Sequence, residues 1–300
     1  MGATATGKSE AGIFLAERFD GEVVSMDSRQ VYRRMDVGTG KVSTAQQARV
    51  PHHLIDFLDP AERSSAGRHA ALVASAAEGI CERGRIPILA GGTGLYFRSF
   101  FEGLIDVVIP RDVLAGIRAG CESRETTALY EELRLKDPER AQDLSANDRI
   151  RITRALELIA WTGRTVTELY SEERTGARDW SVLSFVLTMP RHLLRGKIAG
   201  RTRDLFARGW VDEVEGLLAS GVALEAPGMN SLGYREIAAA LRQGEDASSV
   251  LEAVVMATQQ YAKRQETFFR RDKEAVWIDV SESGWLERMA EQVGSFVSSE

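Results

Sequence analysis

The chain has 300 residues, of which 44% are hydrophobic and 27% are charged, and its formal net charge at pH 7 is -6. A chain of this kind buries a substantial core, which excludes wholesale disorder, and no apolar stretch reaches the roughly 20 residues of a membrane-spanning helix. The acidic total excludes a uniformly basic nucleic-acid binder, but a local basic patch can still bind phosphates, so net charge leaves the partner open. The two cysteines have no metal or redox spacing and no signal peptide is recognisable, so we expect a soluble, cytoplasmic protein.

The first motif lies at residues 2–9, which read Gly-Ala-Thr-Ala-Thr-Gly-Lys-Ser. This order satisfies the phosphate-loop pattern, in which glycines let backbone N–H groups turn toward a diphosphate. Lys8 adds positive charge, Ser9 is placed to hold Mg²⁺, and a helix predicted from residue 10 presents its positive end. A glycine-rich turn that only caps a helix is the weaker alternative. The expected diphosphate-binding residues are Gly2, Thr4, Ala5, Thr6, Gly7, Lys8 and Ser9.

A phosphate loop normally follows a buried strand, and only Met1 stands before Gly2. We therefore expect the N-terminal core strand to be missing. Either the start of the chain was placed too far downstream or the chain is truncated. The first explanation is favoured, because everything after the loop is intact.

Short β-branched runs predict buried strands further along the chain, at residues 22–26, 54–57, 86–90, 182–188 and 276–280. Helical spacing between these runs predicts an α/β fold, namely a P-loop-like parallel sheet flanked by helices. Residues 111–177 are rich in Arg, Glu, Ala and Leu at helical periods and predict an inserted helical subdomain. The catalytic core is then expected to comprise residues 1–110 and 178–300.

Two polar segments follow the predicted strands and should meet at the carboxyl edge of the sheet, where ligands bind in such folds. Asp27 follows the first of these strands and would accept a proton, organise Mg²⁺ or cap the next helix, three readings that the residues alone leave open. Residues 91–96, Gly-Gly-Thr-Gly-Leu-Tyr, bring Thr93 to the same edge. The adjacent His52 and His53 would point to opposite faces of a strand, so we predict no zinc site there.

In their order and spacing, these segments resemble the tRNA dimethylallyltransferase family, also called tRNA isopentenyltransferases. The matching segments are residues 2–9, 27–32, 35–41, 51–56, 91–96, 147–157, 232–236 and 262–265. The resemblance implies transfer of a dimethylallyl group from dimethylallyl diphosphate to the N6 amine of the adenosine that follows the anticodon in tRNA. Dimethylallyl diphosphate, rather than ATP, would occupy the phosphate loop.

The resemblance also implies roles for individual residues. Asp27 would be the general base, Thr93 would lie at the reacting centre, and Arg201 would help to stabilise the departing diphosphate. We expect a monomer that uses Mg²⁺, with an inserted subdomain that binds tRNA. The expected tRNA-binding residues are Asp27, Ser28, Arg29, Gln30, Arg149, Arg151, Arg154, Gly233, Tyr234, Arg235, Lys263, Arg264, Gln265 and Arg270.

One departure from the family and two alternative functions stay open. The family usually has an Arg where this chain has Leu114, and either Arg111 or Arg118 is the candidate replacement. A P-loop nucleotide kinase or an adenylate isopentenyltransferase would need neither the helical insertion nor the basic residues near 263–271. A non-catalytic RNA-binding remnant is favoured only if the N-terminal truncation is real.

Overall fold

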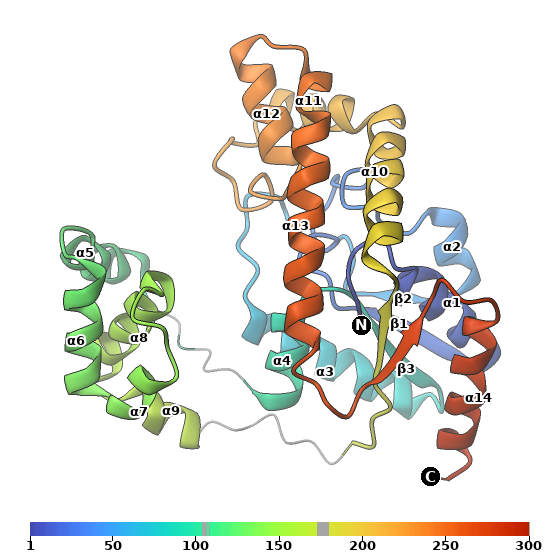
Figure 1. The fold of residues 1–300 in the computed structure, drawn as a ribbon, viewed down its shortest axis with the longest axis horizontal. Helices are drawn as coiled ribbons and strands as arrows, with labels where there is room; N and C mark the ends of the chain where they lie inside the picture. The colour runs from blue at the N-terminus through green and yellow to red at the C-terminus, as the bar shows by residue number, and fades with distance from the viewer. Residues whose placement is uncertain (104–106, 108, 173–179, 300) are drawn as a thin grey trace. The chain divides into compact units, whose positions relative to one another are not determined.

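The computed structural model describes residues 1–103, 107, 109–172 and 180–299. The chain divides into two compact units, one formed by Met1–Phe97 with Asp179–Glu300 and the other by Arg98–Arg178. The first division falls within α4 (Gly94–Glu102), whereas the sequence placed it after residue 110. Figure 1 labels the helices and strands of both units.

The larger unit contains short strands that all pair in parallel. In the described residues these strands are β1 (Gly21–Ser25), β2 (His52–His53), β3 (Ile86–Ala90), β4 (Phe185–Thr188) and β5 (Val276–Asp279). One sheet has the order β2-β1-β3, and a second sheet pairs β4 with β5. The predicted α/β class with a parallel sheet is therefore confirmed.

The predicted strand at residues 54–57 is wrong. Leu54 and Asp56 have φ angles of 61° and 55°, in the left-handed region that an extended strand does not use. The pairing with β1 comes instead from β2, in which His52 lies opposite Val23. Residues 54–57 resemble a strand in sequence, but their backbone forms a loop and makes no β-ladder pairs.

The larger unit also contains helices and one 3₁₀ turn. They are α1 (Lys8–Arg18), α2 (Thr44–Arg49), α3 (Ala66–Glu82), α10 (Arg191–Ala207), α11 (Trp210–Ala219), α12 (Tyr234–Gln243), the 3₁₀ turn η1 (Ala247–Val250), α13 (Leu251–Phe269) and α14 (Trp285–Val297). α1 and α3 both pack against β1 and β3, and α14 packs against α1. All five positions of β1 are buried, as expected for a strand covered on both faces. α10 and α13 run side by side (Figure 1).

The outer edge of β3 differs from its inner edge. All five β3 residues are only partly buried, and no strand in the described residues pairs with β3 on the side away from β1. The start of the chain extends the other sheet instead. The Met1 amino group donates to the Phe185 carbonyl at 2.7 Å, the Leu187 N–H donates to the Met1 carbonyl at 2.9 Å, and Gly2 bridges to Leu187 in parallel.

The smaller unit is helical in its described residues. Besides the end of α4, it contains α5 (Arg111–Glu122), α6 (Thr126–Lys136), α7 (Pro138–Gln142), α8 (Arg149–Thr162) and α9 (Val166–Glu172). Its core includes the fully buried Leu129, Leu133 and Ile152. No helix among the described residues of either unit is long and apolar enough to cross a bilayer.

The buried carboxylate of Glu22 lies near the start of β1, at the end opposite to Asp27, and organises the side chains around it. Glu22 is 3% exposed, and it accepts hydrogen bonds from Arg83 at 2.7 Å and Arg85 at 3.1 Å and contacts His53 Nε2 at 2.6 Å. The hydrogen bond from Arg83 lowers the pKa of Glu22 from its ordinary 4.5 to about 2, although burial opposes this shift.

This geometry predicts how stability depends on pH. Because the pKa of folded Glu22 lies below its ordinary 4.5, its charge stabilises the fold above that pH, and the contribution is lost as the pH falls toward about 2. Glu22→Gln should lower the free energy of unfolding at neutral pH by about 1–3 kcal/mol and flatten its fall in acid. Urea unfolding across this pH range checks the prediction, with the exposed Glu291→Gln as control. An unchanged acid profile in Glu22→Gln would contradict it.

Candidate functional site

The loop before α1 exposes a set of unpaired backbone donors. Ala5 and Gly7 have φ angles of 64° and 85°, which turn the backbone inward. The Thr6 hydroxyl and the Lys8 ammonium both donate to the Ala3 carbonyl, at 2.9 and 2.5 Å. Among the described residues, nothing accepts a hydrogen bond from the N–H groups of Ala5, Thr6 or Gly7, and α1 has no side-chain cap. Such a loop at the positive end of a helix is suited to bind an anion.

A side-chain amide from α13 holds this loop in place. Gln265 is 6% exposed; its Oε1 accepts from the Thr4 N–H at 2.9 Å and its Nε2 donates to the Gly92 carbonyl at 2.8 Å. A Cβ at position 92 would lie 2.3 Å from that nitrogen, so a side chain there would displace the Gln265 amide. The amide therefore joins the phosphate loop to the loop that follows β3.

Asp27 emerges from the carboxyl end of β1, beside these two loops. Its Oδ1 accepts from the Arg29 N–H at 2.8 Å and the Gln30 N–H at 3.4 Å, so it does cap the following turn. Its Oδ2 accepts no hydrogen bond from another described residue. Thr93 supports this turn, because its hydroxyl accepts from the Ser28 N–H at 3.0 Å. One oxygen of Asp27 is thus fixed and the other is available.

A cavity of about 520 Å³ opens beside Asp27, within the range of small-molecule sites. The walls come from the phosphate loop, the turn after β1, the loop at residues 38–39 and the helices α10 to α13. Polar and aromatic residues that line the cavity include Thr4, Asp27, Ser28, Arg29, Thr39, Arg201, Trp210, Tyr234, Arg235, Tyr261 and Arg264. Thr93 is not among the lining residues, so its direct contribution is to the position of the turn.

Two cations and one carboxylate influence one another at this site. Burial lowers the pKa of Lys8 to about 8, while the charge of Asp27 opposes the shift and Arg201 adds to it. Removal from water likewise lowers the pKa of Arg201, again opposed by Asp27. The Arg201 guanidinium makes no hydrogen bond to a described residue, and its Nη2 would lie 1.9 Å from a Cβ at Gly40. The positive charge is incompletely neutralised, which favours an anionic ligand.

A carboxylate that no sequence pattern indicated, Glu213, shapes one wall of the cavity. Glu213 of α11 accepts hydrogen bonds from the backbone N–H groups of Asp36, Val37 and Gly38, at 2.7, 2.7 and 3.1 Å. The Tyr234 hydroxyl also donates to Glu213, at 2.5 Å. Burial and the charge of Glu213 raise the pKa of this phenol. The loop at residues 36–38 is therefore pinned to two helices.

No sequence pattern indicated Trp210 either. Its ring explains why two positions near it are occupied by glycine. A Cβ at Gly38 would lie 1.9 Å from the Trp210 Nε1, and a Cβ at Gly233 would lie 2.1 Å from its ring. Trp210 is 3% exposed and belongs to the core cluster that also contains Val214 and Tyr234. The glycines of two separate motifs therefore make room for one aromatic wall residue.

The residues of the larger unit that were predicted to contact tRNA differ in their exposure and in their ion pairs. Arg235 and Arg264 line the cavity, although Arg235 also pairs with Glu236 at 2.9 Å. Arg270 is exposed and pairs with Glu266 at 2.7 Å. These arginines are available at the surface.

Other residues that were predicted to contact tRNA are buried or already make hydrogen bonds within the protein. Tyr234 is completely buried, and the amide of Gln265 is already used at both ends. Gln30 donates to the Gly40 carbonyl at 3.4 Å. Gly233 donates its N–H to Glu236 at 2.7 Å. In this structure these residues position the walls of the cavity.

In the smaller unit, Arg149 is also used internally. Its guanidinium donates to the carbonyls of Cys121, Glu122 and Arg124 and to the Thr126 hydroxyl, and so caps the end of α5. This arginine has little capacity left for an RNA phosphate.

The other predicted arginines of the smaller unit differ in availability. Arg151 is 64% exposed and pairs with Asp148 at 3.0 Å. Arg154 and Arg118 both pair with the buried Glu157, at 3.1 and 2.7 Å. Arg111 begins α5 and has no ion pair with another described residue. Arg151 and Arg111 are therefore the freer cations.

Comparisons with known proteins point to one family. Residues 30–272 match the family model described as IPP transferase. The chain is 40% identical to a tRNA dimethylallyltransferase of Desulfosudis oleivorans, over 94% of this chain and 90% of that protein. It is 42% identical to a tRNA dimethylallyltransferase of Thermomicrobium roseum, over 98% of this chain and 89% of that protein.

Solved structures give the same result. The full-length tRNA isopentenylpyrophosphate transferase from Bacillus halodurans is 31% identical with a TM-score of 0.71, over 99% of this chain and 94% of that one. A eukaryotic dimethylallyltransferase acting on tRNA is 26% identical with a TM-score of 0.84, over all of this chain and 78% of that one. Since the family model and the relatives cover most of the sequence, the chain belongs to the tRNA dimethylallyltransferase family.

Proposed function

We propose that this protein transfers a dimethylallyl group from dimethylallyl diphosphate to the N6 amine of the adenosine that follows the anticodon in tRNA. The observation that carries the proposal is the cavity lined by Asp27, Arg201 and the start of the phosphate loop, whose Lys8 interacts electrostatically with Asp27. A diphosphate leaving group needs the cations, and an amine nucleophile needs the carboxylate. A family relationship over nearly the whole chain supports this choice of substrates.

The loop, Lys8 and Arg201 would stabilise the leaving group. When the allylic C–O bond breaks, the diphosphate takes the electron pair and the carbon fragment carries a delocalised positive charge. The free N–H groups of Ala5 to Gly7 and the two cations lie where the new negative charge would accumulate. Donors that are already oriented stabilise such charge without reorganisation.

Mg²⁺ fits this site only together with the substrate. No group of three or more His, Cys, Asp or Glu side chains among the described residues forms a cluster that could hold a metal. The Ser9 hydroxyl is exposed and has no hydrogen-bond partner in the described part of the chain. Since Mg²⁺ prefers oxygen ligands and keeps several waters, Ser9 and the diphosphate would hold it together, and the ion would neutralise part of the leaving-group charge.

Asp27 would accept the proton of the adenine amine as the new C–N bond forms. Its Oδ1 is held by backbone N–H groups, which leaves Oδ2 for the substrate. The adenine must leave its stack to reach the cavity. Arg235 and Arg264 at the cavity, and Arg151 in the helical insertion, would contact the RNA. Thr93 would hold the turn that carries Asp27 in position, through its hydrogen bond with the Ser28 N–H.

We also infer a P-loop-like topology. It is supported by the loop of residues 2–9, which leads directly into α1, and by the packing of α1 against β1 and β3 of a parallel sheet.

The function is tested with radiolabelled dimethylallyl diphosphate and three reactions that contain tRNA, AMP or no acceptor. Label that enters only tRNA, and a tRNA nucleoside whose mass matches a dimethylallylated adenosine, is the expected result. Label in AMP would make the protein an adenylate isopentenyltransferase, and no label in either acceptor would contradict the proposal.

The lowered pKa of Lys8 predicts that the affinity for the diphosphate depends on pH. Diphosphate binding favours the charged form of Lys8, whose pKa is about 8 in the free protein, so affinity should fall as the pH rises above that value, by up to about tenfold per pH unit. Lys8→Ala should remove this dependence and lower turnover at least ~10²-fold, with tRNA affinity near wild type. Calorimetric titration across pH 6.5 to 9.5 checks this, with the exposed Lys273→Ala as control. An equal loss of tRNA affinity in Lys8→Ala would refute the role.

Asp27→Asn separates catalysis from capping. Asn caps about as well as Asp, so the thermal midpoint should barely change, whereas turnover should fall ~10²- to 10⁴-fold because the amide accepts no proton. Single-turnover transfer across a pH series measures this loss. Near wild-type rates would remove Asp27 from the reaction, and weak substrate binding repaired by extra Mg²⁺ would assign it to the metal.

A further inference from the structure

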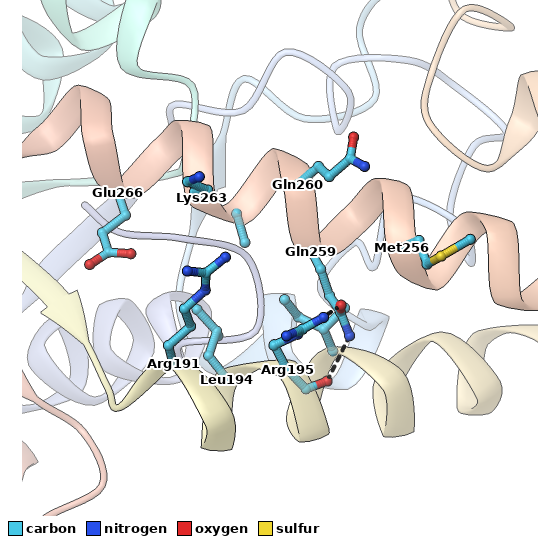
Figure 2. A pocket seen from close by; sticks show the side chains of 10 residues that line it. Arg191, Leu194, Arg195, Met256, Gln259, Gln260, Lys263 and Glu266 are labelled. Carbon is cyan, nitrogen blue, oxygen red and sulfur yellow. Dashed lines mark hydrogen bonds between the residues drawn. The ribbon is translucent and has the colours of Figure 1, made fainter.

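A second hollow lies between α10 and α13 and has a volume of about 260 Å³. Figure 2 shows Arg191 and Arg195 extending from α10 toward α13, and Gln259 extending from α13 toward Arg195. Lys263 of α13 lines the same hollow. We call it the α10/α13 groove.

The cations of the α10/α13 groove are not neutralised. Arg191 and Lys263 form no hydrogen bond or ion pair through their side chains with any other described residue. Arg195 uses only its Nε, which donates to Gln259 Oε1 at 3.1 Å, and Gln259 Nε2 donates back to the Arg195 carbonyl at 3.4 Å. The Gln259 amide therefore orients the guanidinium and leaves its terminal N–H groups free for a ligand. Glu266 also lines the groove, but Arg270 already pairs with it at 2.7 Å.

The floor of the groove is apolar, in contrast to its rim. Leu194, Ile198 and Ala262 are buried there, at 8%, 1% and 2% exposure. Met256 lies at the edge and is 59% exposed. Exposed cations around an apolar floor fit a phosphate whose attached sugar packs against hydrocarbon.

The groove is separate from the cavity that holds Asp27. Of the residues that line the two hollows, only Ile198 and Gln260 are shared. The α13 residues that line the cavity include Ala257, Tyr261 and Arg264. The α13 residues that line the groove include Met256, Gln259 and Lys263, which lie on a different face of the same helix. A ligand in the groove would therefore not occupy the site of transfer.

We propose that the α10/α13 groove binds one phosphodiester of the tRNA backbone, outside the nucleotide that receives the dimethylallyl group. This inference rests on the proposed function. Arg191, Arg195 and Lys263 carry three positive charges against one paired carboxylate, which complements a phosphate. The arginine forks suit the planar spread of phosphate oxygens. A polymer fits better than a small metabolite, because all three cations are exposed along the rim and none closes over a ligand.

Such a contact positions the RNA without reading its sequence. Its loss should weaken binding by a similar factor for every tRNA tested. It should also raise KM for tRNA and leave kcat near wild type, because the groove does not touch the reacting groups.

The test uses the full chain with Arg191→Ala and Lys263→Ala combined. The tRNA dissociation constant is measured from 50 to 300 mM KCl for wild type, the double variant and the control Lys197→Ala. Lys197 is exposed on the same helix, does not line the groove and has no partner among the described residues. The double variant should bind about tenfold more weakly at 0.1 M salt, and the slope of log affinity against log salt should shrink by about one. Lys197→Ala should match wild type.

Wild-type affinity and salt slope in the double variant would overturn the proposal. Inorganic phosphate is titrated in parallel, and its binding to wild type but not to the double variant, with unchanged tRNA affinity, would replace RNA by a small phosphate ligand. These readouts are binding constants, so they are distinct from a failure of the proposed function, which would appear as absent transfer in wild type.

Discussion

The active-site arrangement depends on one buried amide. Gln265 accepts a hydrogen bond from the phosphate loop at Thr4 and donates one to the loop after β3 at Gly92. Both bonds are made away from water, where an unpaired amide would cost about 1–3 kcal/mol. A residue near the end of α13 therefore sets the distance between the loop before α1 and the loop after β3, which border the proposed diphosphate site.

The charged groups near Gln265 have different roles in the proposed reaction. In the proposed reaction, the partly buried Lys8 and the exposed Arg201 at the cavity would supply the positive charge that meets the diphosphate. Asp27 accepts hydrogen bonds from the backbone through Oδ1, which would leave Oδ2 for the substrate. Glu213 binds the loop at residues 36–38, and Trp210 packs against Gly38 of this loop, so both would hold this wall in place during transfer.

Local sequence patterns predict this protein well where a short segment decides its own structure. The phosphate loop, the position of Asp27 after β1 and the parallel α/β class all follow from neighbouring residues. The backbone partners of Glu213 and Gln265 lie more than 170 residues away, and a side chain that binds distant backbone groups leaves no periodic signal. The strand expected at residues 54–57 failed for a related reason, because tertiary hydrogen bonds to residues 30 and 31 hold that segment in a loop.

We expect the diphosphate to bind at the loop of residues 2–9, which Gln265 holds in place. A crystal structure with an unreactive thio-analogue of dimethylallyl diphosphate and Mg²⁺ tests this most directly. We expect the diphosphate oxygens within hydrogen-bonding distance of the Ala5 to Gly7 N–H groups, with the Lys8 ammonium turned from the Ala3 carbonyl to the ligand. A diphosphate bound in the α10/α13 groove, or a phosphate loop left empty at saturating analogue, would contradict the account.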